Sequence, residues 1–296
     1  MPGGLACQPQ AWRRLALRAP GFSSALVAMS SPALAALLGL QVALLLGGLV
    51  LLWRQGLSSA ARARPPLLPA WEVSLSDFFL FLWLVILGGF AGGYAIGLYL
   101  KYHPTDTPHQ LILGTAAMHA GMLLGMTGYR FIFARAQARL GFALPGTLSS
   151  GVVTFLIATL VVTTVSLGWQ LVLKLCHYTI KPQDSIELLR HTDSLALRIT
   201  LVSVAVVVAP ISEELLFRAG IFRYVRTRLP RWLALLLPAL LFALLHLDLG
   251  SFVPLMALAV VFSLAYERTG NIGTTMVAHA LFNLNAAILV LAGVDS

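Results

Sequence analysis

Long apolar runs, separated by short polar segments, follow one another along almost the whole chain. They cover roughly residues 33–53, 78–100, 111–129, 151–174, 197–217, 232–247, 252–266 and 273–293. A helix needs about 20 apolar residues to cross the hydrocarbon core of a bilayer. The runs are continuous, unlike the alternating strands of a barrel, and a helix satisfies its own backbone polar groups in lipid. We therefore predict an all-α, polytopic transmembrane helical bundle of about eight spans, of which the sixth and seventh are short.

The composition supports a membrane protein and excludes a water-soluble globule. Hydrophobic residues make up 58% of the 296 and charged residues only 10%, whereas about a quarter of the residues in soluble proteins are charged. The formal net charge of +9 comes mainly from arginine. In a membrane protein such an excess usually faces anionic headgroups from cytoplasmic loops. Membrane lipid is therefore an expected partner, and nucleic acid is not.

Breaks in the apolar pattern divide the chain into four parts. We expect an N-terminal tail at residues 1–31, N-terminal transmembrane helices at 32–176, a loop or interfacial helix at 177–196, and a C-terminal transmembrane region at 197–293. Residues 185–198 mix leucines with charges, a pattern that suits a helix lying at the membrane surface.

The distribution of lysine and arginine bears on the orientation. With eight spans, the odd-numbered loops hold 12 of the 20 basic residues and the other side holds 8. The positive-inside rule then places the odd loops in the cytoplasm and both termini outside. Arg13, Arg14 and Arg18 in the tail argue the other way, and a translation start at Met29 would sharpen the ratio to 12 against 5.

Few ionisable side chains interrupt the apolar runs, and most of them lie in the C-terminal third. Ionisable groups inside a bilayer are costly, so each one is a hypothesis for a functional site. The candidates are Glu213, Glu214 and Arg218 in the fifth run and its extension, His246 at the end of the sixth, His279 and Asn283 in the eighth, and His119 in the third.

Helical spacing separates the two glutamates. Glu214 and Arg218 are four residues apart, so on a helix they meet on one face and neutralise each other. Glu213 points about 100° away from Glu214 and lacks that partner. The spacing therefore assigns a structural role to Glu214 and leaves Glu213 free for chemistry.

The other candidates are also spaced four residues apart. His279 and Asn283 project from one helix face, and so do Phe242 and His246. If residues 213–228 and 232–246 form antiparallel helices, Glu213 and His246 lie at similar depth and can touch. This arrangement requires Arg223, Arg226 and Arg228 to reach the membrane surface along their long side chains, which we expect them to do.

Two interpretations of these residues compete. For any single residue, a satisfied ion pair, a core histidine or a polar contact between helices is the more common explanation. Taken together, however, a carboxylate, two imidazoles and a carboxamide on three neighbouring segments supply a base, a proton partner and oxyanion donors.

Three sequence motifs carry a resemblance to a known family. Residues 211–221 read ISEELLFRAGI, residues 241–247 read LFALLHL, and residues 266–283 read YERTGNIGTTMVAHALFN. In order and spacing they resemble the EExxxR, FxxxH and HxxxN motifs of the CPBP family of intramembrane proteases. This CAAX protease and bacteriocin-processing (Abi) family includes the Ras-converting CAAX endopeptidase. The resemblance covers residues 195–293, and Ala219 stands where family members commonly carry glycine.

The resemblance implies a role for each matched residue. Glu213 is the expected base, His246 its partner in activating water, and His279 with Asn283 the expected oxyanion hole. Glu214, Arg218 and Phe242 are expected to support the site structurally. No cofactor is implied, and zinc bound by His246, His279 and Glu213 is the less favoured alternative.

The expected function is that of an intramembrane endopeptidase, a CAAX-protease-like hydrolase of the cell membrane. Its substrate is expected to be a membrane-associated peptide or protein, with prenylated peptides as one class. The alternative from another class is a non-catalytic membrane scaffold or regulator with the same fold. A proton-relaying transporter fits less well, because the chain lacks paired broken helices in two repeated halves.

Overall fold

The computed structural model describes residues 31–132, 145–180 and 183–294, and these residues form helices and no strand. Seven helices within these residues are long and apolar enough to cross a membrane, and the all-α polytopic prediction is confirmed. The predicted tail, which contains Arg13, Arg14, Arg18 and Met29, lies outside the described residues except for Ser31. The seven helices are Pro32–Leu57, Leu75–Tyr102, Thr107–Phe131, Thr147–Leu175, Leu195–Arg226, Leu249–Thr269 and Ile272–Leu291.

The sixth and seventh predicted runs differ from each other in the structure. The sixth is helix α12 (Arg231–Leu245), whose 15 residues span only about 22 Å at 1.5 Å per residue, less than the bilayer core. The seventh is α13 (Leu249–Thr269), a full-length span. The predicted run stopped at residue 266 because the next two residues of the helix, Glu267 and Arg268, are charged. Asp248 begins this helix by accepting hydrogen bonds from the backbone N–H groups of Gly250 and Ser251.

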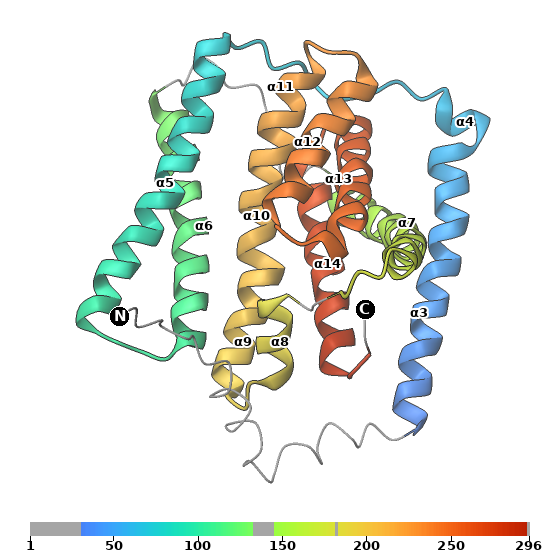
Figure 1. Ribbon diagram of the computed structural model, residues 1–296. Helices are drawn as coiled ribbons and strands as arrows, with labels where there is room; N and C mark the ends of the chain where they lie inside the picture. The colour runs from blue at the N-terminus through green and yellow to red at the C-terminus, as the bar shows by residue number, and fades with distance from the viewer. Residues whose placement is uncertain (1–30, 133–144, 181–182, 295–296) are drawn as a thin grey trace.

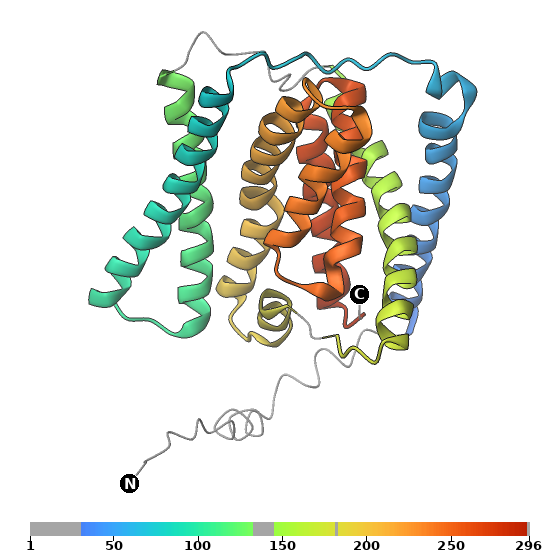
Figure 2. The same cartoon turned by 45° about the horizontal axis from the view of Figure 1, so that its top comes forward.

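The helices form three groups in space (Figures 1 and 2). The central group is the long helix that contains α9, α10 and α11, together with α12, α13 and α14. The α5–α6 hairpin flanks it on one side, and α7 with α3 flanks it on the other. The remaining bounds are α3 Ser31–Leu52, α4 Ser59–Arg62, α5 Leu75–Tyr102, α6 Thr107–Ile132, α7 Thr147–Leu175, α8 Asp184–His191, α9 Leu195–Ser203, α10 Ala209–Glu213, α11 Arg223–Arg226 and α14 Ile272–Leu291.

Helices α5 and α6 pack closely because glycines remove side chains from their interface. A Cβ atom on Gly88 would collide with the carbonyl of Gly121, and a Cβ on Gly121 would collide with that of Gly88. Small residues allow such close backbone approach between transmembrane helices. The far side of α6 then contacts the long central helix, which brings His119 next to Ser212.

The segment between α7 and the long helix forms one short helix. In α8 the buried Leu189 packs against Ala287 and Val290 of α14. One interfacial helix was expected over residues 185–198. In the structure α8 ends at His191, and α9 starts at Leu195. Ser194 caps this start by accepting a hydrogen bond from the backbone of Leu197.

The linker between α4 and α5 crosses the end of the bundle at which α11 ends and α12 begins (Figures 1 and 2). Arg223 donates from Nε to the carbonyl of Pro69 at 2.9 Å. Arg228 donates from Nη1 to the carbonyl of Trp71 at 3.2 Å. These arginines hold the linker against the central helices.

The expectation that three arginines of this helix end reach out to the membrane surface is wrong for Arg223, which is 1% exposed. Arg226 pairs with the buried carboxylate of Glu267, Nε to Oε1 at 2.6 Å. Arg231 binds the other oxygen of the same carboxylate. Backbone carbonyls and a buried carboxylate thus bind these guanidinium groups.

Candidate active site

The long helix is irregular on both sides of the first motif. Two π-helical segments, Val204–Val208 and Glu214–Phe222, enclose the five residues of α10. Pro210 lacks a backbone N–H, so it cannot bond to the carbonyl four residues before it, and its ring disfavours a regular turn there. π-Helical turns are rare and occur frequently at functional sites. The glutamates of the first motif therefore lie where the backbone departs from a regular α-helix.

The ion pair expected from the spacing of the first motif is present. Nη1 of Arg218 lies 2.9 Å from Oε1 of Glu214, and the two side chains are 1% and 0% exposed. The rings of Phe242 and Phe262 lie 4.8 and 5.3 Å from the guanidinium carbon. Aromatic faces attract a cation at this range. The pair is thus enclosed by the second motif and by α13.

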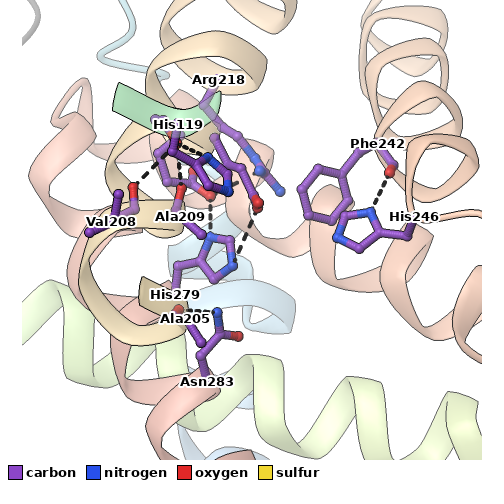
Figure 3. Close-up of polar contacts among 12 residues, drawn as sticks. His119, Ala205, Val208, Ala209, Arg218, Phe242, His246, His279 and Asn283 are labelled. Carbon is purple, nitrogen blue, oxygen red and sulfur yellow. Dashed lines mark hydrogen bonds and ion pairs between the residues drawn. The ribbon is translucent and has the colours of Figure 1, made fainter. Parts of the chain in front are cut away.

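His279 on α14 links the two glutamates (Figure 3). Its Nδ1 lies 2.8 Å from Oε1 of Glu214, and its Nε2 lies 3.8 Å from Oε2 of Glu213. The His279 side chain is 4% exposed and that of Glu213 is 18% exposed. Glu213 therefore faces the imidazole of the third motif, and Glu214 binds His279 as well as Arg218.

The charges of this cluster can balance inside the bundle. Glu214 is paired with Arg218, so it accepts a hydrogen from Nδ1 of His279. The second ring nitrogen, Nε2, then faces Glu213. Arg218 offsets the charge of Glu214, and the imidazole of His279 lies between Glu214 and Glu213. A buried charge without such compensation would be costly.

His246 does not contact Glu213 among the described residues. Its Nδ1 donates to the carbonyl of Phe242 at 2.7 Å, and its ring centroid lies 4.6 Å from that of Phe242. In Figure 3 His246 and Phe242 lie on one side of the view, and His279, Asn283 and His119 lie on the other. The contact predicted from equal depth is absent because the bond to Phe242 turns the ring toward its own helix.

This bond also determines which ring nitrogen of His246 is available. Because Nδ1–H donates to a carbonyl, a neutral ring keeps the lone pair on Nε2. His246 follows directly after the short α12, about 22 Å from the start of that helix.

Asn283, one turn after His279 on α14, contacts the first π-helical segment. Its Nδ2 donates to the carbonyl of Ala205 at 2.8 Å. A carboxamide has two N–H hydrogens, so one donor remains after this bond. The residue thus stabilises the irregular backbone and keeps a hydrogen for a ligand.

The sequence analysis named His119 as a candidate but did not predict its partner, Ser212. His119 on α6 places its Nδ1 2.7 Å from Oγ of Ser212, the residue before Glu213. The signal was present, because His119 is the one histidine within the first four apolar runs. The motifs gave it no partner, since the contact depends on how α6 packs.

The residues considered for zinc do not form one ligand set. No group of three or more histidine, cysteine, aspartate or glutamate side chains within the described ranges is placed to bind a metal ion. Glu213 and His279 face each other, whereas Nδ1 of His246 is bound to its own helix. That the protein binds no metal cofactor stays a prediction, which a measurement of its metal content tests.

Comparison with known proteins shows what the C-terminal third of the chain is similar to. Residues 195–285 match the family described as Type II CAAX prenyl endopeptidase Rce1-like, and the resemblance predicted from the three motifs is confirmed. An 84-residue stretch is 34% identical to the UPF0177 protein YbdI of Lactococcus lactis subsp. lactis (strain IL1403). This stretch covers 28% of the chain and 45% of that relative, less than half of its length. No solved structure matches the chain.

Proposed function

Since residues 195–285 form an Rce1-like region within a multi-pass membrane protein, we propose that this chain is an intramembrane endopeptidase that uses Glu213 to activate water. The family match supports a CAAX-type protease role and implies a peptidase. The observation that carries the proposal is the link from Arg218 through Glu214 and His279 to Glu213. It orients an imidazole toward a partly exposed carboxylate inside the bundle.

The first step assigns the base. Glu213 takes a proton from water, and the hydroxide attacks the carbonyl carbon of the scissile peptide bond. A positioned carboxylate within hydrogen-bond reach of a water can act as its general base. The free Nε2 of His246 accepts the second hydrogen of the same water and so orients it.

The second step concerns the charge that develops on the carbonyl oxygen. We propose that an N–H at Nε2 of His279 and the remaining amide hydrogen of Asn283 donate to this oxyanion. Donors fixed in advance at a developing charge are among the largest contributions to catalysis. The C–N bond then breaks, and the proton held by Glu213 passes to the leaving amine, which restores the carboxylate.

The substrate follows from where the groups lie. Glu213 and His246 lie on helices that are embedded in the apolar bundle, so a peptide must enter from or beside the membrane. We propose a membrane-associated peptide or protein as substrate, with prenylated peptides as one class. We also propose the plasma membrane as the location and no metal as cofactor.

A peptidase assay in proteoliposomes tests the proposal. Purified wild type and Glu213→Gln are incubated with a library of membrane-anchored peptides, with and without a prenyl group, and products are identified by mass spectrometry. Glu187→Gln on α8 is the matched control, because Glu187 is exposed and distant in the chain from the motifs. We expect cleavage by wild type and control and none by Glu213→Gln. Equal products from all three would disprove the assignment of the base, and no products from any would favour the scaffold.

A further inference from the structure

The first half of the chain contributes a buried histidine to the candidate site. His119 belongs to α6, outside the Rce1-like region at 195–285. It is 5% exposed, and its partner Ser212 is fully buried. A histidine inside an apolar span is costly unless it is hydrogen-bonded, so its hydrogen bond to Ser212 is informative.

The direction of this hydrogen bond follows from the other contacts of Ser212. The hydroxyl oxygen lies 3.0 Å from the carbonyl of Ala209 and 3.2 Å from that of Val208. A serine hydroxyl has one hydrogen, and one of these carbonyls accepts it. The oxygen is then the acceptor for Nδ1–H of His119. A chain of donors thus runs from α6 into the backbone at the start of α10.

The position of α10 explains why such a contact matters. This five-residue segment lies between two π-helical segments, so regular backbone bonding does not by itself set the direction in which Glu213 leaves the helix. Two side chains from neighbouring helices bind this region. Asn283 binds the carbonyl of Ala205 before it, and His119 binds Ser212 within it.

We propose that His119 is a positioning residue of the active site, which holds α10 through Ser212 so that Glu213 faces His279. The inference rests on the proposed function and extends the catalytic unit to the N-terminal helices. Since His119 acts through Ser212, both should affect the rate constant of the chemical step and neither should affect substrate affinity. A misplacement of a catalytic group by about 1 Å can reduce the rate about 100-fold.

Kinetics of single and double variants test the proposal in the full-length protein. His119→Leu removes the donor, and His119→Asn keeps an N–H donor near the position of Nδ1. We expect kcat to fall at least about 10-fold in His119→Leu with little change in KM, and to recover within about 3-fold in His119→Asn. Ser212→Ala should lower kcat similarly, and the double variant His119→Leu/Ser212→Ala should be no slower than either single variant.

His109→Leu is the control. His109 lies on the same helix as His119 and its side chain is exposed, so this substitution should leave kcat unchanged. Thermal unfolding of each variant shows whether it is folded, and if His119→Leu does not fold, Ser212→Ala and His119→Asn decide. An unchanged kcat in Ser212→Ala, no recovery in His119→Asn, or additive losses would overturn the role of His119 while peptidase activity stands. Absence of turnover in the wild type would instead overturn the proposed function and this inference with it.

Discussion

The imidazole of His279 binds the carboxylate of Glu214 at 2.8 Å, and this contact joins residues 65 positions apart in the chain. Glu214 also pairs with Arg218, so one buried carboxylate orients a cation and an imidazole together. A partner that binds one ring nitrogen in this way fixes the orientation of the imidazole. Glu214 therefore stabilises the fold and also aims Nε2 of His279 at Glu213.

Replacement of Glu213 should separate chemistry from stability. Glu213→Gln keeps the shape of the side chain and cannot take a proton, so we expect turnover to fall about 100-fold or more. The free energy of unfolding should change by less than about 0.5 kcal/mol, because the buried pair of Glu214 and Arg218 is untouched. Initial rates and thermal unfolding in the same detergent measure both quantities. Turnover that survives the substitution would show that another group is the base.

Replacement of either member of the buried pair should have the opposite pattern. Glu214→Ala or Arg218→Ala leaves an uncompensated charge at a site that is at most 1% exposed, and such a loss typically costs about 3 to 5 kcal/mol. We expect lower expression and a lower unfolding temperature in both variants. If both variants were fully stable and yet inactive, the division of roles between the two glutamates would be wrong.

Metal analysis should distinguish water activated by Glu213 from a zinc site. Zinc would need three protein ligands at about 2.0 to 2.2 Å with an open fourth position. We expect the purified protein to lack stoichiometric zinc and to keep its activity after chelation, because Asn283 is an uncommon zinc ligand and suits an oxyanion. Elemental analysis and activity measured with chelator provide the test. About one zinc per chain, with activity lost on chelation and restored by the metal, would refute this prediction.

The loop after His246 should respond to acid through Asp248. Burial raises the pKa of this carboxyl, but hydrogen bonds from Ser251, Gln183 and the backbone of Gly250 outweigh it, and the pKa is lowered from 3.8. A lowered pKa in the folded state means that the ionised form stabilises the protein. This stabilisation is present above about pH 5 and is lost as the pH falls below 3.8 and through the folded value.

Asp248→Asn should reveal this contribution. Asparagine caps a helix about as well as aspartate, so stability near pH 7 should change by less than about 1 kcal/mol. Below pH 4 the variant should lose less stability than the wild type, since it cannot take up the proton. Unfolding temperatures measured from pH 3 to pH 7 test this. Parallel curves for the two proteins would contradict the role assigned to Asp248.

Local patterns in the sequence determined the helices and one contact of the site. Continuous apolar runs predict spans because a lipid-embedded backbone must bond to itself. The spacing of Glu214 and Arg218 predicts their ion pair because residues four apart share a helix face. The motifs likewise indicated the residues of the Rce1-like region, because their order and spacing are visible without any structure. These features can be read from the order and spacing of residues along the chain.

Contacts between residues on different helices could be known only from the tertiary structure. The link from His279 to Glu214, the pairing of His119 with Ser212 and the burial of Arg223 join segments that lie 65 or more residues apart. Each depends on how two helices are rotated against each other. In the fifth helix that rotation is altered by the π-helical turns around α10, which a regular helical period does not represent. Glu213 and His246, which were expected to touch, face different partners, His279 and the carbonyl of Phe242.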